Sequence, residues 1–384
     1  MTVVTVLFVS ALVVVGLLLL VSPGTPTPFV DERGEPLAGS LSEKVWIPIG
    51  GVDQGMFVKS QDARNPVLLY LHGGMPDYFL TDRYPTGLDE HFTVVWWDQR
   101  GSGLSYSADI PPESVNPEQL ISDALEVTAY LRERFGQDKI YLMGHSGGTF
   151  VGIQVAARAP QWIHAYLAVA QMSNQLESEM LAGSAAATPS RRRAAQMSNQ
   201  LESEMLAYDY MLQRFRDDGD AAMVRRLEEA PVGDRVPLPE SYLKVRDVAM
   251  HRLGIGTTHR MTSVLTGLLL PSLLNREYTL AEKIGLWRGK LSFGRQLWNT
   301  QLSTDLTTTL TRLEVPVYFF HGAYDYTVSY LLARAYYDRL DAPVKGFYTF
   351  ERSAHSPLFE EPRRMREIMR ADVLTGSTSL ADPE

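Results

Sequence analysis

The sequence predicts an α/β protein in which a mostly parallel, doubly wound sheet is interrupted by an inserted helical cap. Segments with a helical spacing of apolar residues alternate with short apolar runs until about residue 171, and the alternation resumes only after about residue 311. Alternating strands and helices favour parallel strands joined by right-handed crossovers, and a long interruption favours an insertion. With 384 residues, of which 45% are hydrophobic, the chain is long enough for one large domain with such an insertion. The apolar runs, each typical of a buried strand, lie at residues 66–71, 92–97, 140–143, 165–170 and 315–320.

The charge balance and the lack of cysteine exclude several classes of function. The formal net charge is −9, from 45 acidic and 36 basic residues, which argues against nucleic acid and against an anionic membrane surface as the main partner. The chain contains no cysteine, so disulfides, thiolate catalysis and cysteine-ligated zinc are excluded. No cluster of His, Asp and Glu has the spacing of a metal site, so we expect neither a metal nor an organic cofactor.

The N-terminus predicts membrane attachment. Residues 3–21 are uncharged and mostly apolar over the length that a membrane-spanning helix needs, and no clear cleavage site follows. We therefore expect a single uncleaved anchor in the cell membrane, with the rest of the chain outside the cytoplasm; a cleaved signal, which would make the protein secreted, is the alternative. The expected division is residues 1–28 for the anchor and a proline-containing linker, 29–170 for the first part of the core, 171–311 for the cap, and 312–384 for the second part of the core and the C-terminal tail.

Local signals define the remaining elements in order. Residues 44–49 and 55–59 have the pattern of a hairpin with a loop between them. Asn116 followed by Pro117 predicts a helix start, and that helix ends near Gly136. Further expected elements are a helix that ends near residue 159, a helix at about residues 328–340 and a last strand at about residues 344–350.

The cap contains an internal duplication. Residues 171–182 recur without change at 196–207, separated by an arginine-bearing spacer. Two copies do not form a solenoid, which needs at least about three repeats to bury a continuous core. If one copy forms the first cap helix, the other is chemically indistinguishable from it and competes for the same place.

The segment 144–148 carries the strongest signal for chemistry. It reads Gly-His-Ser-Gly-Gly and lies between a predicted strand and a predicted helix. A turn this tight places the serine in an unfavourable backbone conformation, and its neighbours two residues away lie too close to the strand and the helix to carry side chains. Such a turn, a nucleophile elbow, aims the serine hydroxyl out of the sheet. Ser146 is therefore the candidate nucleophile.

Two later residues complete a candidate catalytic triad with Ser146. Asp325 follows the strand at 315–320, and His355 follows the last predicted strand. Acyl transfer by serine needs a base that takes its proton and an acid that holds this base in the right tautomer. Because the carboxyl ends of parallel strands share one edge of a sheet, we expect the three side chains to meet there.

An acyl-transfer site also needs two donors for the oxyanion. One donor is expected to be the backbone N–H of Gly147, the residue after the nucleophile. The second is expected from the loop after the strand at 66–71, where either Gly74 or Met75 can supply it. Of the other histidines, His145 is expected to pack or to donate a hydrogen bond, and His72 and His321 to shape loops.

These motifs together resemble the α/β-hydrolase superfamily, in the branch that contains the proline iminopeptidases and related serine hydrolases. The resemblance spans about residues 45–370, implies the α/β-hydrolase fold and matches the family's chain order of Ser, Asp and His. Two positions depart from the proline iminopeptidase pattern: Met75-Pro76 stands where Pro-Gly is usual, and Gly147 stands where an aromatic residue usually follows the serine. The motifs are His72-Gly73-Gly74, residues 98–105, residues 144–148, residues 321–325 and Ala354-His355.

The resemblance also implies that cap carboxylates bind the α-ammonium group of the substrate. The residues of this chain that correspond to those carboxylates are Glu177, Glu179, Glu202 and Glu204. Their place in a predicted helix instead favours solvation at the surface. The substrate-binding residues are otherwise unknown.

We expect a serine hydrolase that cleaves an ester or an amide of a small molecule or a short peptide through an acyl-enzyme on Ser146. An aminopeptidase of the proline iminopeptidase type is one form of this hypothesis, and a carboxylesterase or an acyltransferase is another. A non-catalytic binding module on the same fold is the alternative from a different class.

Overall fold

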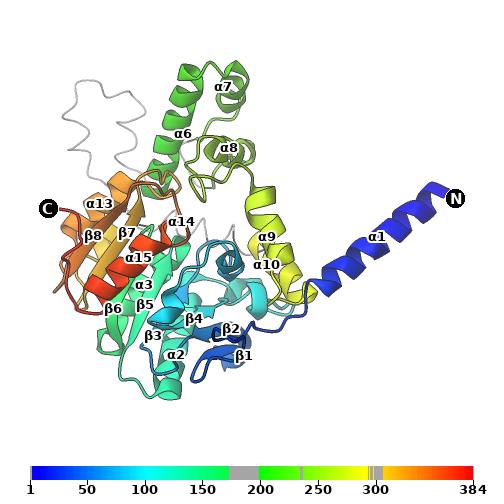
Figure 1. The fold of residues 1–384 in the computed structure, drawn as a ribbon. Helices are drawn as coiled ribbons and strands as arrows, with labels where there is room; N and C mark the ends of the chain where they lie inside the picture. Colours follow the sequence, from blue (N-terminus) through cyan, green and yellow to red (C-terminus); the bar gives the residue numbers. More distant parts are fainter. Residues whose placement is uncertain are drawn as a thin grey trace, which may run out of the picture.

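A single mixed sheet organises the protein. The computed structural model describes residues 2–172, 199–233, 237–292, 294, 297 and 306–383. Within these residues the sheet has eight strands in the order β1-β2-β4-β3-β5-β6-β7-β8, with helices on both faces (Figure 1). The pairs β1/β2 and β2/β4 are antiparallel, and the pairs from β4 to β8 are parallel. The predicted α/β fold with a mostly parallel sheet is therefore confirmed. The strands are β1 (Leu41–Ile49), β2 (Val52–Ser60), β3 (Val67–Leu71), β4 (Thr93–Trp97), β5 (Ile140–His145), β6 (Ile163–Val169), β7 (Val317–Gly322) and β8 (Lys345–Phe350).

The helices fall into three groups: α-helices outside the cap, α-helices of the cap, and short 3₁₀ and π segments. Outside the cap lie α1 (Thr2–Leu20), α2 (Pro117–Phe135), α3 (Gly147–Arg158), α13 (Tyr330–Arg339), α14 (Pro357–Glu360) and α15 (Pro362–Ile368). The cap contains α6 (Asn199–Asp217), α7 (Ala221–Glu228), α8 (Glu240–Arg252), α9 (Leu270–Leu274), α10 (Leu280–Ser292) and α12 (Leu306–Thr309). Short 3₁₀ and π segments are η1 (Tyr78–Asp82), η2 (Leu88–Glu90), η3 (Gly103–Ser105), η4 (Pro112–Ser114), η5 (Pro160–Trp162), η6 (Leu265–Leu269) and η7 (Met369–Val373).

Both faces of the central strands are buried, which explains their continuous apolar sequences. In β3, Val67, Leu69 and Leu71 pack into one hydrophobic cluster with α2 and α3, whereas Leu68 and Tyr70 pack into a second cluster with α14 and α15. Successive side chains of a strand point to opposite faces, so a strand covered on both sides must be apolar throughout.

The first hairpin is tighter than the sequence predicts. The predicted loop covers residues 50–54, but β1 and β2 pair as far as Ile49 and Val52. Gly50 and Gly51 have φ angles of 54° and 81°, the left-handed conformation that a two-residue hairpin turn requires at both central positions. The glycine pair therefore shortens the loop and lengthens both strands.

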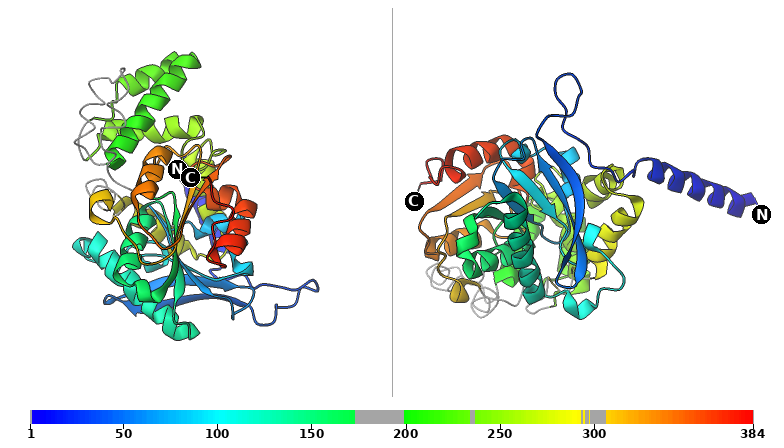
Figure 2. Two further views of the ribbon diagram at one scale, coloured as in Figure 1. Left: turned by 90° about the vertical axis from the view of Figure 1, so that its left-hand side faces the viewer. Right: turned by 90° about the horizontal axis from the view of Figure 1, so that it is seen from below.

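The cap contains a hydrophobic core of its own. Helices α6, α7 and α8 pack around Met211, Phe215, Leu227 and Tyr242, and they stand apart from the sheet (Figures 1 and 2). Helix α10 instead lies directly on the loop after β4. The backbones are so close that a Cβ atom at Gly289 would lie 2.3 Å from the carbonyl oxygen of Gly101. Glycine at this position permits the close approach.

The structure describes the two duplicated segments to different extents. Residues 199–207 of the second copy form the start of α6. Of the first copy the structure describes only Gln171 and Met172, which are buried, and the backbone N–H of Met172 donates to Thr149 Oγ1 at 2.9 Å. The rest of the first copy lies outside the described residues, so the predicted competition between the copies is not tested.

The N-terminal helix α1 projects away from the rest of the molecule (Figures 1 and 2). Its C-terminal end is held by Lys283, whose ammonium group donates to the carbonyl oxygen of Val21 at 3.2 Å and to Ser22 Oγ at 2.8 Å. In the part of the chain that the structure describes, no helix combines the length and the apolarity needed to span a membrane. The expectation of a membrane-spanning anchor at residues 3–21 is therefore not supported.

Candidate active site

Ser146 occupies a strained turn between β5 and α3. Its φ and ψ angles are 54° and −124°, a backbone conformation that residues other than glycine rarely adopt. A Cβ atom at Gly144 would lie 2.7 Å from the carbonyl oxygen of Gly148, and one at Gly148 would lie 2.0 Å from that of Leu71. The two glycines are thus required by backbone contact, which is the physical reason for the spacing seen in the sequence.

The structure places His355 and Asp325 in direct contact. His355 Nδ1 lies 2.9 Å from Asp325 Oδ2, while Asp325 Oδ1 accepts the backbone N–H groups of Thr327 and Val328, each at 2.9 Å. Burial by itself raises the pKa of Asp325, but the charge of His355 and its hydrogen bond outweigh burial, so the pKa is lowered. An ionised Asp325 accepts the Nδ1–H of His355, which leaves Nε2 as the nitrogen able to take a proton.

One cavity of ≈ 280 Å³ joins the candidate catalytic residues. Ser146 and His355 both line it, together with Gly74 and Met75. A Cβ atom at Gly73 would lie 3.1 Å from Ser146 Oγ, so the loop after β3 passes close to the serine hydroxyl. Each candidate residue, from strands far apart in the sequence, therefore reaches the same edge of the sheet.

The candidate oxyanion donors surround Ser146. Gly147 is the first residue of α3 and lines a smaller adjoining cavity of ≈ 50 Å³ with Gly73 and Gly74. Helix N-termini present backbone N–H groups to negative charge. Gly147 therefore lies beside the loop after β3, since both line this cavity, and an oxyanion site needs donors from two such segments.

Two other histidines hold loops at this edge, as the sequence predicts. His72 Nε2 accepts the backbone N–H of Gln99 at 3.1 Å, and His321 Nε2 donates to the carbonyl oxygen of Val328 at 3.0 Å. Burial lowers the pKa of His72 to about 4 and also lowers that of His321, so both rings are neutral at pH 7.

Sequence reasoning missed the polar group that surrounds His145. The ring of His145 contacts Asp77, Tyr70 and the carbonyl oxygen of His355, and Asp77 also lines the cavity of Ser146. The available signal was an acidic residue shortly after the Gly73-Gly74 loop, but nothing in the sequence pairs it with His145.

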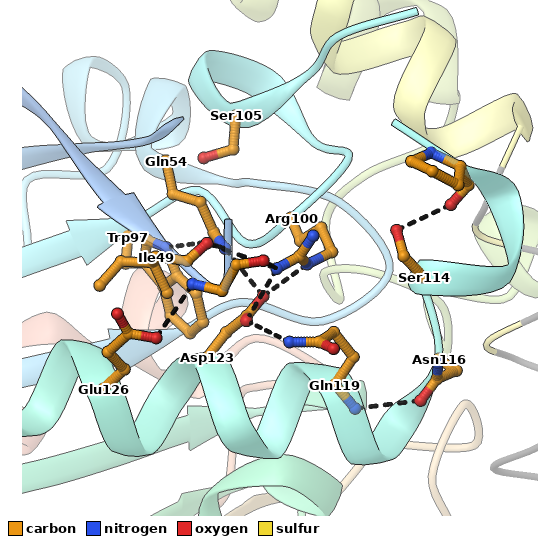
Figure 3. Close-up of polar contacts among 12 residues, drawn as sticks. Ile49, Gln54, Trp97, Arg100, Ser105, Ser114, Asn116, Gln119, Asp123 and Glu126 are labelled. Carbon is orange, nitrogen blue, oxygen red and sulfur yellow. Dashed lines mark hydrogen bonds and ion pairs between the residues drawn. The ribbon is translucent and has the colours of Figure 1, made fainter. Parts of the chain in front are cut away.

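The motif at residues 98–105 connects the first hairpin to helix α2 through polar contacts. Arg100 forms a buried ion pair with Asp123 of α2, with Nε at 2.7 Å and Nη2 at 3.0 Å from its two oxygens, and Nη2 also donates to the carbonyl oxygen of Gly50 (Figure 3). Gln54 and Gln119 donate to the same carboxylate, each at 2.8 Å. The motif therefore ties the first hairpin to α2 and has a structural role.

The cap glutamates do not have the surface positions that the sequence favours. Glu204 is completely buried, and its two oxygens accept Arg246 Nε and Nη2, each at 2.6 Å, with the Tyr242 hydroxyl at 2.9 Å. Glu202 is also buried, at 5% exposure. The prediction of helix-surface solvation is wrong for both; Glu204 is enclosed by its contacts with Tyr242 and Arg246 of α8. Glu177 and Glu179 lie outside the described residues.

The cap side of the cavity carries mixed charge. Arg246, Asp247 and Lys290 line it, and Arg246 Nη1 donates to Asp247 Oδ1 at 3.0 Å. Burial lowers the pKa of Lys290, and the charge of Asp247 opposes this effect. Among the residues that the structure describes, no group of three or more His, Asp or Glu side chains could hold a metal ion.

Comparisons with known proteins agree with this fold. The family model for the alpha/beta hydrolase fold matches residues 66–362. A probable aminopeptidase of Bacillus subtilis, YbaC, is 29% identical over 318 residues, which cover 82% of this chain and 91% of that protein.

Two of the solved structures with a similar fold carry proline iminopeptidase names. One is a proline iminopeptidase-related protein from Thermus thermophilus, with a TM-score of 0.55, 21% identity, and coverage of 86% of this chain and 98% of that chain. The other is a proline iminopeptidase from Mycobacterium smegmatis, with a TM-score of 0.54, 16% identity, and coverage of 87% and 98%. The resemblance to the proline iminopeptidase branch is thus supported, and the chain belongs to the α/β-hydrolase fold family.

Proposed function

We propose that this hydrolase cleaves an ester or an amide through an acyl-enzyme on Ser146, with His355 as the base and Asp325 as the residue that orients it. One observation carries the proposal: the His355–Asp325 pair, at 2.9 Å, and the strained Ser146 line or adjoin one cavity at the carboxyl edge of the sheet. A serine in this geometry, with a base and an orienting acid, is the recurring arrangement of acyl transfer.

The proposed reaction has two half-reactions. Ser146 Oγ attacks the carbonyl carbon of the substrate while its proton passes to His355 Nε2, and the backbone N–H groups of Gly147 and of Gly74 or Met75 stabilise the oxyanion. The tetrahedral intermediate collapses, and the leaving group departs with the proton from His355. Water then attacks the acyl-enzyme by the same route and releases Ser146.

The substrate class that we propose is a short peptide or an aminoacyl compound with an accessible N-terminal residue. Support comes from the likeness to the probable aminopeptidase over most of both chains. The cap carboxylate Glu204 does not favour this class, because its two oxygens are already bound by Arg246. A carboxylesterase or an acyltransferase would use the same three residues, so relative rates on proline anilide and short-chain p-nitrophenyl esters separate these activities.

Labelling with a fluorophosphonate tests the mechanism itself. We expect the full chain to be labelled and to lose both label and turnover on Ser146→Ala, because the label forms only on an activated serine hydroxyl. The control variant is Ser107→Ala, because Ser107 is exposed. Ser105 is unsuitable as a control site, since its hydroxyl donates a hydrogen bond to the buried carbonyl oxygen of Asp98. A folded protein without label or turnover would indicate a binding module, and label that survives Ser146→Ala would refute the assignment of the nucleophile.

We also propose, from the N-terminal sequence alone, that the catalytic domain lies outside the cytoplasm, either attached to the membrane through residues 3–21 or secreted. Protease accessibility in intact cells that produce the full chain tests the location, and carbonate extraction of the membranes tests the attachment.

A further inference from the structure

The ring of His145 joins three segments that surround the candidate active site. His145 directly precedes Ser146 and is 6% exposed. Its Nε2 lies 2.9 Å from the backbone carbonyl oxygen of His355. Its Nδ1 lies 3.1 Å from Asp77 Oδ2, in the loop after β3, and 3.0 Å from the hydroxyl of Tyr70.

The partners of the ring determine where its protons lie. A carbonyl oxygen only accepts, so His145 Nε2 must carry a proton to bond the carbonyl of His355. The Tyr70 hydroxyl has one proton, and its 2.7 Å contact with Asp77 Oδ2 uses it. His145 Nδ1 therefore faces a carboxylate oxygen and the lone pairs of Tyr70, and only an N–H at Nδ1 satisfies both. Both ring nitrogens carry protons in this arrangement.

The titratable groups around the ring are compatible with an imidazolium. Burial alone would lower the pKa of His145, but the hydrogen bond and charge of Asp77, with the charge of Asp325, outweigh it and raise the pKa. Burial also raises the pKa of Tyr70, which keeps its hydroxyl protonated. His72, another neighbour, is neutral at pH 7 and adds no competing positive charge.

We propose that His145 is a positioning residue that acts as a doubly protonated imidazolium, donating one N–H to Asp77 and the other to the backbone carbonyl of His355. It thereby holds the loop of the candidate base against the loop after β3 and the nucleophile elbow. This inference rests on the proposed function, because it concerns the placement of His355 relative to Ser146.

Other contacts of the same loop show why this bond matters. The backbone N–H of His355 donates to the carbonyl oxygen of Gly256 at 3.3 Å, and that of Ala354 donates to Glu360 Oε1 at 2.9 Å. The contact with His145, at the carbonyl group of His355 itself, links the loop to the residue next to the nucleophile. A shift of about 1 Å between reacting groups costs on the order of 10²-fold in rate, so loss of this link should lower kcat while binding persists.

Kinetics of three variants test the role. We expect His145→Ala to lower kcat on the order of 10²-fold with KM changed less than about twofold. We expect His145→Gln to recover about tenfold of that loss, because its amide N–H can still donate to the His355 carbonyl. His164→Gln, at an exposed histidine that stacks on Tyr141 outside the site, should match the unmodified protein. Unchanged kcat in His145→Ala, or a loss carried entirely by KM, would overturn the proposal.

Two further measurements separate the possible failures. In ¹⁵N-histidine spectra of the full chain at pH 7, the His145 signals are identified as those that a folded His145→Gln variant lacks. We expect them to come from two protonated ring nitrogens. A neutral ring with an unprotonated Nδ1 would contradict the proposal. Activity that survives Ser146→Ala would instead refute the proposed function. If Ser146→Ala abolishes activity and His145→Ala does not change kcat, the mechanism stands and the positioning role fails.

Discussion

At the scale of single residues, Asp325 determines which nitrogen of His355 can act as a base. Asp325→Asn keeps the size of the side chain, but its amide favours the wrong histidine tautomer. We expect kcat to fall on the order of 10⁴-fold, measured as steady-state turnover of a p-nitrophenyl ester. Asp341→Asn is the matched control, because Asp341 is exposed and pairs only at 3.6 Å with Arg312. Comparable losses in both variants would show that Asp325 has no special role.

Glu360, which binds the loop of His355, makes the stability of the folded protein depend on pH. Its carboxylate accepts the backbone N–H groups of His259 at 2.6 Å and Ala354 at 2.9 Å, yet burial raises its pKa from 4.5 to about 7. The folded state therefore binds this proton more tightly than the unfolded state does. The stability that the proton contributes is complete below about pH 4.5 and is lost as the pH rises through about 7.

Glu360→Gln tests this dependence, because glutamine does not titrate. We expect the urea midpoint of the unmodified protein to fall between pH 5 and pH 8 by more than that of the variant. His145, whose pKa is also raised, contributes the same change to both proteins, so the comparison isolates Glu360. Identical pH slopes in the two proteins would show that Glu360 is ionised throughout.

At the scale of elements, the ion pair between α6 and α8 distinguishes the two copies of the duplication. Glu204→Ala leaves Arg246 buried without the carboxylate that holds it, and removal of one partner of a buried ion pair costs about 3–5 kcal/mol. Glu179→Ala makes the same change in the same local sequence of the first copy. We expect it to alter the free energy of unfolding by less than about 0.5 kcal/mol. Equal effects in urea denaturation would mean that the copies exchange places.

The second copy is continuous in the chain with the rest of helix α6, which favours its place at the start of that helix. It continues directly into the rest of α6, where Met211 and Phe215 enter the cap core, whereas the first copy continues into the spacer. The first copy in turn continues from β6 and supplies the buried Gln171 and Met172. The two identical segments thus differ in their flanking residues, which gives the second copy a covalent advantage at the start of α6.

At the scale of the whole molecule, the duplication offers a deletion that returns the cap to a single copy of the repeated sequence. Deletion of residues 173–197 joins Met172 to Ser198 and restores one uninterrupted copy of the repeated sequence. We expect this variant to fold, to keep kcat within about twofold, and to unfold at a similar urea midpoint, because every described contact of Met172 and α6 can remain. Lost activity in a folded deletion variant would show that the removed segment contributes to the site.

Much of the fold and the candidate triad could be predicted because their signals are local. Each central strand is a short apolar run, and each candidate catalytic residue follows such a run, so the shared edge of a parallel sheet brings Ser146, Asp325 and His355 together without any knowledge of side-chain packing. The glycines of the elbow are equally local, since the backbone approach that requires them lies within the same turn and its adjacent strand.

Tertiary structure alone decided which polar groups pair across segments. Glu204 resembles a surface residue in its helix, but Arg246, distant in the chain, buries and neutralises it. Asp77 and His145 show no sign of pairing in the sequence, and they meet only when the loop after β3 reaches the elbow. The amino-acid sequence therefore determined the fold class, the chain order of Ser, Asp and His and the elbow, whereas packing determined the cap contacts and the protonation of His145. The physical reason is that strand and turn preferences act over a few neighbouring residues, but the charge state of a buried group depends on every group that folding brings within hydrogen-bond distance.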